Sequence, residues 1–107
     1  MLDQDLELPT THYPMLAPSR LTAELRLEFR RAVLEALELA VRSGFTSVDV
    51  DLVSTTDVDA SGLGVLILLQ KRARERGLSV RLLHVPATLR DMLESTRLAP
   101  LFEIAKD

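Results

Sequence analysis

The chain has 107 residues, 47% of them apolar, which is enough for the core of one domain and leaves no room for a second. Charged residues make up 27% and the net charge is -3, a balance typical of a globular domain and unfavourable for binding nucleic acid, whose phosphates require clustered Lys and Arg. No cysteine is present, which excludes disulfides, thiolate metal sites and cysteine nucleophiles.

The beginning of the chain does not resemble a secretory signal. Asp3, Asp5 and Glu7 occupy positions where a signal peptide has a basic region followed by an apolar one. The longest unbroken apolar run, residues 65–69, is far shorter than the roughly 20 residues that span a bilayer. We therefore expect a cytoplasmic protein that does not insert into a membrane.

Three prolines interrupt residues 1–20, at Pro9, Pro14 and Pro18, and leave room only for short extended segments. We expect one strand at residues 6–11. Because Pro14 and Pro18 fall where a second strand would lie, the first hairpin is expected to be incomplete. An exposed sheet edge could then pair between chains and give a homodimer.

The next segments carry clear periodicity. Apolar residues recur at three- and four-residue steps through residues 21–42, which predicts an amphipathic helix capped by Gly44. Residues 47–53 alternate, with valines and a leucine on one face and Asp49 and Asp51 on the other, as in a half-buried strand. The acidic face suggests that one face of the sheet is poorly covered.

The second half of the chain repeats the alternation of helix and strand. A turn at residues 57–64 opens a helix at 61–76 that Gly77 can terminate, and a strand at 78–85 follows. Pro86 suits the first position of a helix reaching residue 96, and residues 98–104 form a short terminal element. The predicted fold class is α/β, a mixed sheet of about four strands with helices chiefly on one face.

The residues at the start of the second helix resemble a family signature. The sequence Asp-Ala-Ser-Gly-Leu-Gly at 59–64 is similar to the Asp-Ser-Ser-Gly-Leu-Gly motif, set between a strand and a helix, of STAS domains of the bacterial anti-sigma factor antagonist (anti-anti-sigma factor) type. The order of flanking elements agrees as well. The resemblance covers residues 21–104, so residues 1–107 are expected to form a single STAS domain with an abbreviated N-terminal strand region at 1–20.

The resemblance implies a non-enzymatic module that regulates transcription by binding a partner. In this family an anti-sigma factor that is also a serine kinase, of the histidine-kinase-like ATPase type, phosphorylates the serine that corresponds to Ser61. Phosphorylation releases the kinase, and a phosphatase resets the cycle. The residues expected to contact the partner are Asp57, Asp59, Ala60, Ser61, Gly62, Leu63 and Gly64.

Two positions depart from the family pattern. A turn similar to Gly-Glu-Leu-Asp usually precedes the first helix, whereas residues 16–19 read Leu-Ala-Pro-Ser, so that the acidic residue is missing or replaced by Ser19. Ala60 replaces the first serine of the motif, which removes a hydroxyl and leaves the turn intact.

The residues leave several alternatives open. Ser61 could be only a helix cap, since serine is among the commonest caps. Residues 65–69 are either covered by another helix or form an apolar patch for the partner, to which Leu63 would contribute. His12 and His84 lack the spacing of metal ligands, so they are expected to be structural and no metal is expected. No Walker-type Gly-Lys-Ser/Thr follows Gly62 and Gly64, so no cofactor is expected and ATP would come with the partner.

Two other functions remain compatible with the resemblance. One is a constitutive subunit of a larger assembly, similar to STAS proteins that brace the ATPase of an ABC-type lipid transporter or form a stress-signalling scaffold. The other is a small-ligand-binding STAS domain that senses a nucleotide or a lipid. The departure at residues 16–19 favours the constitutive subunit, whereas the intact Ser61 favours the phosphorylated switch.

Overall fold

The structure, a computed structural model, describes residues 11–106. The strand expected at residues 6–11 lies outside the described residues except for Thr11, which belongs to no strand. The expectation of an incomplete first hairpin also depends on residues 1–10.

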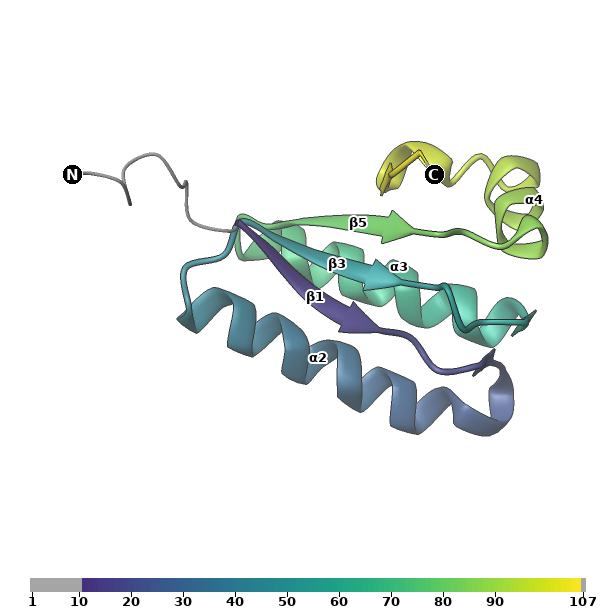
Figure 1. Cartoon of the computed structure of the whole chain (residues 1–107), viewed down its shortest axis with the longest axis horizontal. Coiled ribbons are helices and arrows are strands. Elements are labelled where there is room, and N and C mark those ends of the chain that lie inside the picture. The colour runs from purple at the N-terminus through teal and green to yellow at the C-terminus, as the bar shows by residue number, and fades with distance from the viewer. Residues whose placement is uncertain (1–10, 107) are drawn as a thin grey trace.

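A four-stranded sheet forms the centre of the molecule (Figure 1). Its strands are β1 (His12–Leu16), β3 (Ser47–Asp51), β5 (Ser79–Leu83) and β6 (Glu103–Ile104), in the order β1-β3-β5-β6. Every neighbouring pair is parallel. The predicted α/β class with about four strands is confirmed, but the described strands form a parallel sheet and not the mixed sheet that was expected. Parallel pairing follows because a helix or a longer connection separates each pair of adjacent strands.

Two long helices lie side by side against one face of this sheet, as Figure 1 shows. They are α2 (Arg26–Arg42) and α3 (Ala60–Glu75). The expected helix 61–76 is correct to within one residue at each end, whereas α2 ends as expected at residue 42 but begins five residues later than the expected start at 21. The third helix, α4 (Ala87–Ser95), lies beyond the end of β5. Two short 3-10 turns, η1 (Ala23–Leu25) and η2 (Ala99–Leu101), precede α2 and β6.

The ends of the helices follow the capping residues of the sequence. Gly44 and Gly77 each follow a helix with φ of +80°, a left-handed conformation that favours glycine, so both expected C-terminal caps are confirmed. Pro86 is the N-cap residue of α4, one position earlier than expected. Its extended backbone, with ψ of 155°, places it just outside the helix.

Strand β1 contradicts the expectation that Pro14 interrupts the chain, because Pro14 lies at the middle of the strand. The amide of Ala17 donates to the carbonyl of Asp51 at 2.9 Å, and the amide of Ser47 donates to the carbonyl of Thr11 at 3.1 Å. Since backbone groups alternate along a strand, the odd-numbered residues face β3, and Pro14 faces the side of β1 that no other described strand occupies. The missing amide hydrogen therefore costs no bond within the sheet.

A second, very short ladder was not predicted. It pairs β2 (Arg20–Leu21) with β4 (Asp57–Val58) in parallel, with Arg20 opposite Asp57. The amides of Thr56 and Asp57 also donate to the Ser19 carbonyl, at 2.8 and 3.3 Å. The sequence indicated only a turn at 57–64, because two residues are too few to show alternation. This ladder fastens the segment before α2 to the start of α3.

The core lies between the sheet and the two long helices. Alternate residues of β3 and β5 point into it and meet the inner faces of α2 and α3. The most deeply buried side chains, with at most 1% exposure, include Leu21, Val33, Val48, Val50, Leu52, Leu66, Leu69, Leu82, Leu89 and Leu93. The expected helix stripe and the expected inner face of β3 are therefore both part of the core.

The opposite face of the sheet is more enclosed than the sequence suggested. Asp49 is only 6% exposed, because polar groups on the neighbouring strands surround it. Its carboxylate lies 3.0 Å from an Arg81 guanidinium nitrogen and accepts a 3.0 Å hydrogen bond from Ser47. Within residues 11–106, no helix combines the length and the apolar character needed to cross a bilayer.

Candidate phosphorylation and partner-binding site

The start of α3 is capped by Asp59. One carboxylate oxygen accepts the amide of Ser61 at 2.8 Å and that of Gly62 at 3.3 Å, and the other accepts the amide of Ala23 at 3.1 Å. The amide of Asp59 in turn donates to the Leu21 carbonyl at 3.0 Å. A single carboxylate thus satisfies two free amides of the helix and holds η1 against it.

The same hydrogen bonds affect the acidity of Asp59. Desolvation is the largest single influence and raises the pKa, but the amides of Ala23, Gly62 and Ser61 together outweigh it. The pKa of Asp59 is consequently lowered from its ordinary value, because each amide stabilises the charged form.

Ser61 is the second residue of α3 and is not its cap, so the interpretation of Ser61 as a simple cap is wrong. Asp59 takes that role because it occupies the extended position immediately before the helix. The side chain of Ser61 is half-buried, and its hydroxyl forms no hydrogen bond within the described residues. The described part of the fold therefore makes no structural use of the hydroxyl.

The other expected contact residues divide between surface and interior. Asp57, Ala60 and Gly64 are exposed, and Asp59 is half-buried. Ala60 and Gly64 line the same hollow as Ser61. Gly62 and Leu63 are buried. A Cβ atom on Gly62 would overlap the carbonyl oxygen of Leu21 and lie 2.5 Å from its Cβ, so the absence of a side chain permits the close approach of β2.

The apolar run at the start of α3 is also divided. Val65, Leu66 and Leu69 are buried in the core, whereas Ile67 and Leu68 are half-buried. The run therefore wraps around more than one face of the helix, as a helix packed against both the sheet and α2 requires. Of this run, the half-buried Leu68 and the buried Val65 line the same hollow as Ser61.

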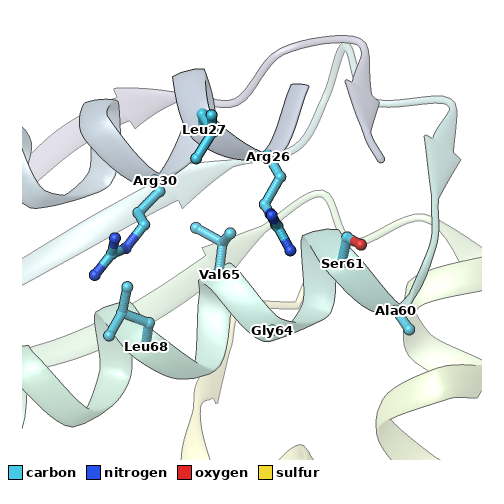
Figure 2. A pocket seen from close by; sticks show the side chains of 8 residues that line it. All are labelled: Arg26, Leu27, Arg30, Ala60, Ser61, Gly64, Val65 and Leu68. Atoms are coloured by element: carbon cyan, nitrogen blue, oxygen red, sulfur yellow. The ribbon is translucent and has the colours of Figure 1, made fainter. Parts of the chain in front are cut away.

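That hollow is a groove of about 470 Å³ between the first turns of α2 and α3 (Figure 2). Arg26, Leu27 and Arg30 of α2 form one side, and Ser61 and Leu68 of α3 lie on the other, together with Ala60, Gly64 and Val65. Figure 2 shows the guanidinium groups of both arginines extending towards α3. The three residues from α2 were not predicted as part of the site, although the sequence shows two arginines four positions apart near the start of the predicted helix.

The two histidines lie at opposite ends of the parallel sheet and do not approach each other. Nδ1 of His12 lies 2.6 Å from the Ser47 hydroxyl oxygen, and Nδ1 of His84 lies 2.8 Å from a carboxylate oxygen of Asp51. The hydrogen bond to His84 is the main reason why the pKa of Asp51 is lowered. No cluster of three potential metal ligands occurs within residues 11–106.

The family of the chain follows from comparison with known sequences. A family model described as "Mlab, STAS domain" matches residues 19–103, which is most of the chain. The chain belongs to the STAS domain family. The comparison with curated proteins gives no match.

Solved structures with the same fold include anti-sigma factor antagonists. A candidate anti-sigma factor antagonist from Thermotoga maritima superposes with a TM-score of 0.72 and 19% identity, over 88% of this chain and 80% of that chain. Unphosphorylated SpoIIAA, an anti-sigma factor antagonist, superposes with a TM-score of 0.66 and 12% identity, over 94% of this chain and 84% of that chain. Phosphorylated SpoIIAA from Bacillus, described as a cell fate determinant, superposes with a TM-score of 0.66 and 15% identity, over 94% of this chain and 87% of that chain. These similarities establish the shared fold.

Proposed function

We propose that the chain is a regulatory binding module of the anti-sigma factor antagonist type, switched by phosphorylation of Ser61. The observation that carries the proposal is the position of Ser61 at the start of α3, where Asp59 caps the helix. Ser61 is partly exposed there, and its hydroxyl forms no hydrogen bond with any residue of 11–106. A kinase can modify this hydroxyl without dismantling the cap. The proposed partner is a serine kinase of the histidine-kinase-like ATPase type that also acts as an anti-sigma factor.

Phosphoryl transfer in this scheme is carried out by the partner. The Ser61 oxygen attacks the γ-phosphorus of ATP, the new oxygen–phosphorus bond forms as ADP leaves, and a base of the kinase accepts the hydroxyl proton. This chain has no Walker-type phosphate-binding sequence, so its contribution is to present the hydroxyl. A phosphatase then removes the phosphate.

Phosphorylation is expected to weaken partner binding because of charge and bulk. A phosphoserine carries between about one and a half and two negative charges at neutral pH, added here beside Asp57 and Asp59. A partner surface that fits the neutral hydroxyl loses complementarity to that group. The surface proposed for this contact consists of Asp57, Ala60, Ser61, Gly64 and the exposed part of the groove.

The test begins with a pull-down from the source cell to obtain the partner, followed by affinity measurements with four purified forms. Unmodified protein and Ser61→Ala should bind with similar affinity, and verified phospho-Ser61 protein should bind at least about tenfold more weakly. Ser79→Ala is the control, because Ser79 is an exposed serine at the first residue of β5. Equal affinities of modified and unmodified protein would contradict the switch and favour the constitutive subunit of an assembly.

The identity of the captured protein distinguishes the remaining functions. A histidine-kinase-like ATPase supports the proposed switch, whereas a transporter ATPase supports the constitutive subunit. A small molecule that co-purifies without a protein partner supports a ligand-binding STAS domain.

A further inference from the structure

The groove beside Ser61 contains two positive charges that the fold does not neutralise. Arg26 and Arg30 both line it. Neither arginine forms an ion pair within residues 11–106. The sequence explains the lack of ion pairs along the helix, because no acidic residue lies three or four positions from either arginine. Glu28, the acidic residue in the first turn of α2, lines a different hollow.

The position of these arginines is unfavourable for the isolated domain. They are four residues apart on one helix, a spacing at which like charges repel. Arg26 is also the first residue of α2, near the positive end of the helix dipole, where an acidic side chain would be more favourable. An anion placed in the groove would relieve both effects.

The amides at the start of α3 are not available to such an anion. The amides of Ser61 and Gly62 already donate to Asp59. The guanidinium groups from α2 are therefore the cationic donors that face this part of the groove. Guanidinium is well suited to the task, because its planar set of N–H donors binds two phosphate oxygens at once.

We propose that the phosphate of phospho-Ser61 is bound within the same chain by Arg26, with Arg30 one helical turn away as a second cation. The proposal rests on phosphorylation of Ser61, as argued for the function above, and adds how the modified state is held. The phosphate would bridge α3 to α2 across the groove and cover the apolar surface of Leu27 and Leu68 that a partner could otherwise reach. The groove would be closed to the partner when Ser61 is phosphorylated and open when it is not.

The test uses protein in which phosphoserine is introduced at position 61 during synthesis, so that neither kinase nor partner is needed. Phosphorus NMR spectra recorded across a pH series give the midpoint of the phosphate titration. Asp57 and Asp59 shift this midpoint upwards in all forms, whereas a guanidinium in contact with the phosphate shifts it downwards. We expect the midpoint in the wild-type chain to lie about one pH unit below that in Arg26→Gln, with a smaller shift for Arg30→Gln.

Two controls make the comparison specific. Arg31→Gln removes an exposed arginine of the same helix that does not line the groove, and it should leave the midpoint unchanged. Arg26→Lys keeps the charge and should restore part of the shift. The same midpoint in the wild type, Arg26→Gln and Arg31→Gln would overturn the proposed contact. Because phosphoserine is supplied directly, that result is separate from the question of whether a kinase modifies Ser61 in the cell.

Discussion

Gly62 and Gly64 lie two residues apart in α3, yet the rest of the chain encloses only the first. Gly62 is in close contact with the backbone of Leu21, whereas a Cβ on Gly64 would have no neighbour within 4 Å. The first glycine is therefore required by packing. The second leaves space at the groove and costs helix stability, because glycine has more conformational freedom to lose than alanine.

Substituting the two glycines separately tests this difference. Gly62→Ala should lower the free energy of unfolding by about 1–3 kcal/mol, because β2 must move to admit the methyl group. Gly64→Ala should raise it by about 0.5–1 kcal/mol. Urea unfolding followed by circular dichroism measures both. Equal effects of the two substitutions would contradict the close contact between Gly62 and Leu21.

Asp59 gives the domain a specific sensitivity to acid. Its pKa is lower in the folded chain than the ordinary value of 3.8. The carboxylate therefore stabilises the fold fully above pH 3.8, and this contribution is lost as the pH falls through the lower folded-state pKa. The charge at this position is thus linked to the stability of the helix that carries Ser61.

Asp59→Asn keeps an oxygen that can cap the helix but does not titrate in this range. The wild type should be more stable than Asp59→Asn at pH 6, and the difference should shrink as the pH is lowered to about 3. Thermal unfolding at several pH values measures the difference, with Asp57→Asn as a control for the loss of a nearby acid. A difference that stays constant with pH would contradict the role of the charged carboxylate.

At the scale of elements, β1 accommodates a proline because it lies at the edge of the sheet formed by the described strands. Its odd-numbered residues direct their backbone groups towards β3, and Pro14 has an even number. The proline also removes a donor from the side of β1 that no described strand occupies, which makes that side a poorer template for pairing with a second copy of the chain.

Exchanging the position of the proline tests the register of β1. Pro14→Val should change the free energy of unfolding by no more than about 0.5 kcal/mol. Met15→Pro should cost about 1–3 kcal/mol beyond Met15→Ala, because only the proline variant removes an amide that faces β3. Urea unfolding of the three variants gives the comparison. A Pro14→Val variant that is as unstable as Met15→Pro would mean that the register is wrong.

The short ladder between β2 and β4 has a structural effect larger than its length suggests. It places Leu21 against Gly62 and brings Ala23 within hydrogen-bonding distance of Asp59. The segment before α2 and the start of α3 are therefore positioned together. This coupling explains how residues from α2 become part of the surface around Ser61.

At the scale of the whole molecule, the proposed binding surface combines segments that are far apart in the sequence. Leu27 is 67% exposed on α2 and lies at the groove opposite Leu68 of α3. Ile67, the neighbour of Leu68, instead lines a hollow together with Leu101 near the C-terminus. Adjacent apolar residues thus belong to different surfaces.

This arrangement predicts different effects of two similar substitutions on binding to the captured partner. Leu68→Ser should weaken binding by about tenfold, because it removes apolar surface at the groove. Ile67→Ser should leave the affinity nearly unchanged. Calorimetric titration of both variants, after circular dichroism confirms that they are folded, makes the comparison. A loss confined to Ile67→Ser would place the contact on the other side of α3.

Elements with strong periodicity, and the motif at 59–64, could be predicted without the structure. Helices at 21–42 and 61–76, the strand at 47–53 and the caps at Gly44 and Gly77 were predictable, because their signals depend on spacing and backbone conformation within one segment. The tertiary structure alone decided the strand across Pro14, the enclosure of Asp49, the role of Asp59 as the cap and the groove with Arg26 and Arg30. Each of these four features depends on a contact between residues that are far apart in the sequence. Such a contact leaves no periodic pattern in either segment, so it cannot be predicted from the spacing of residues.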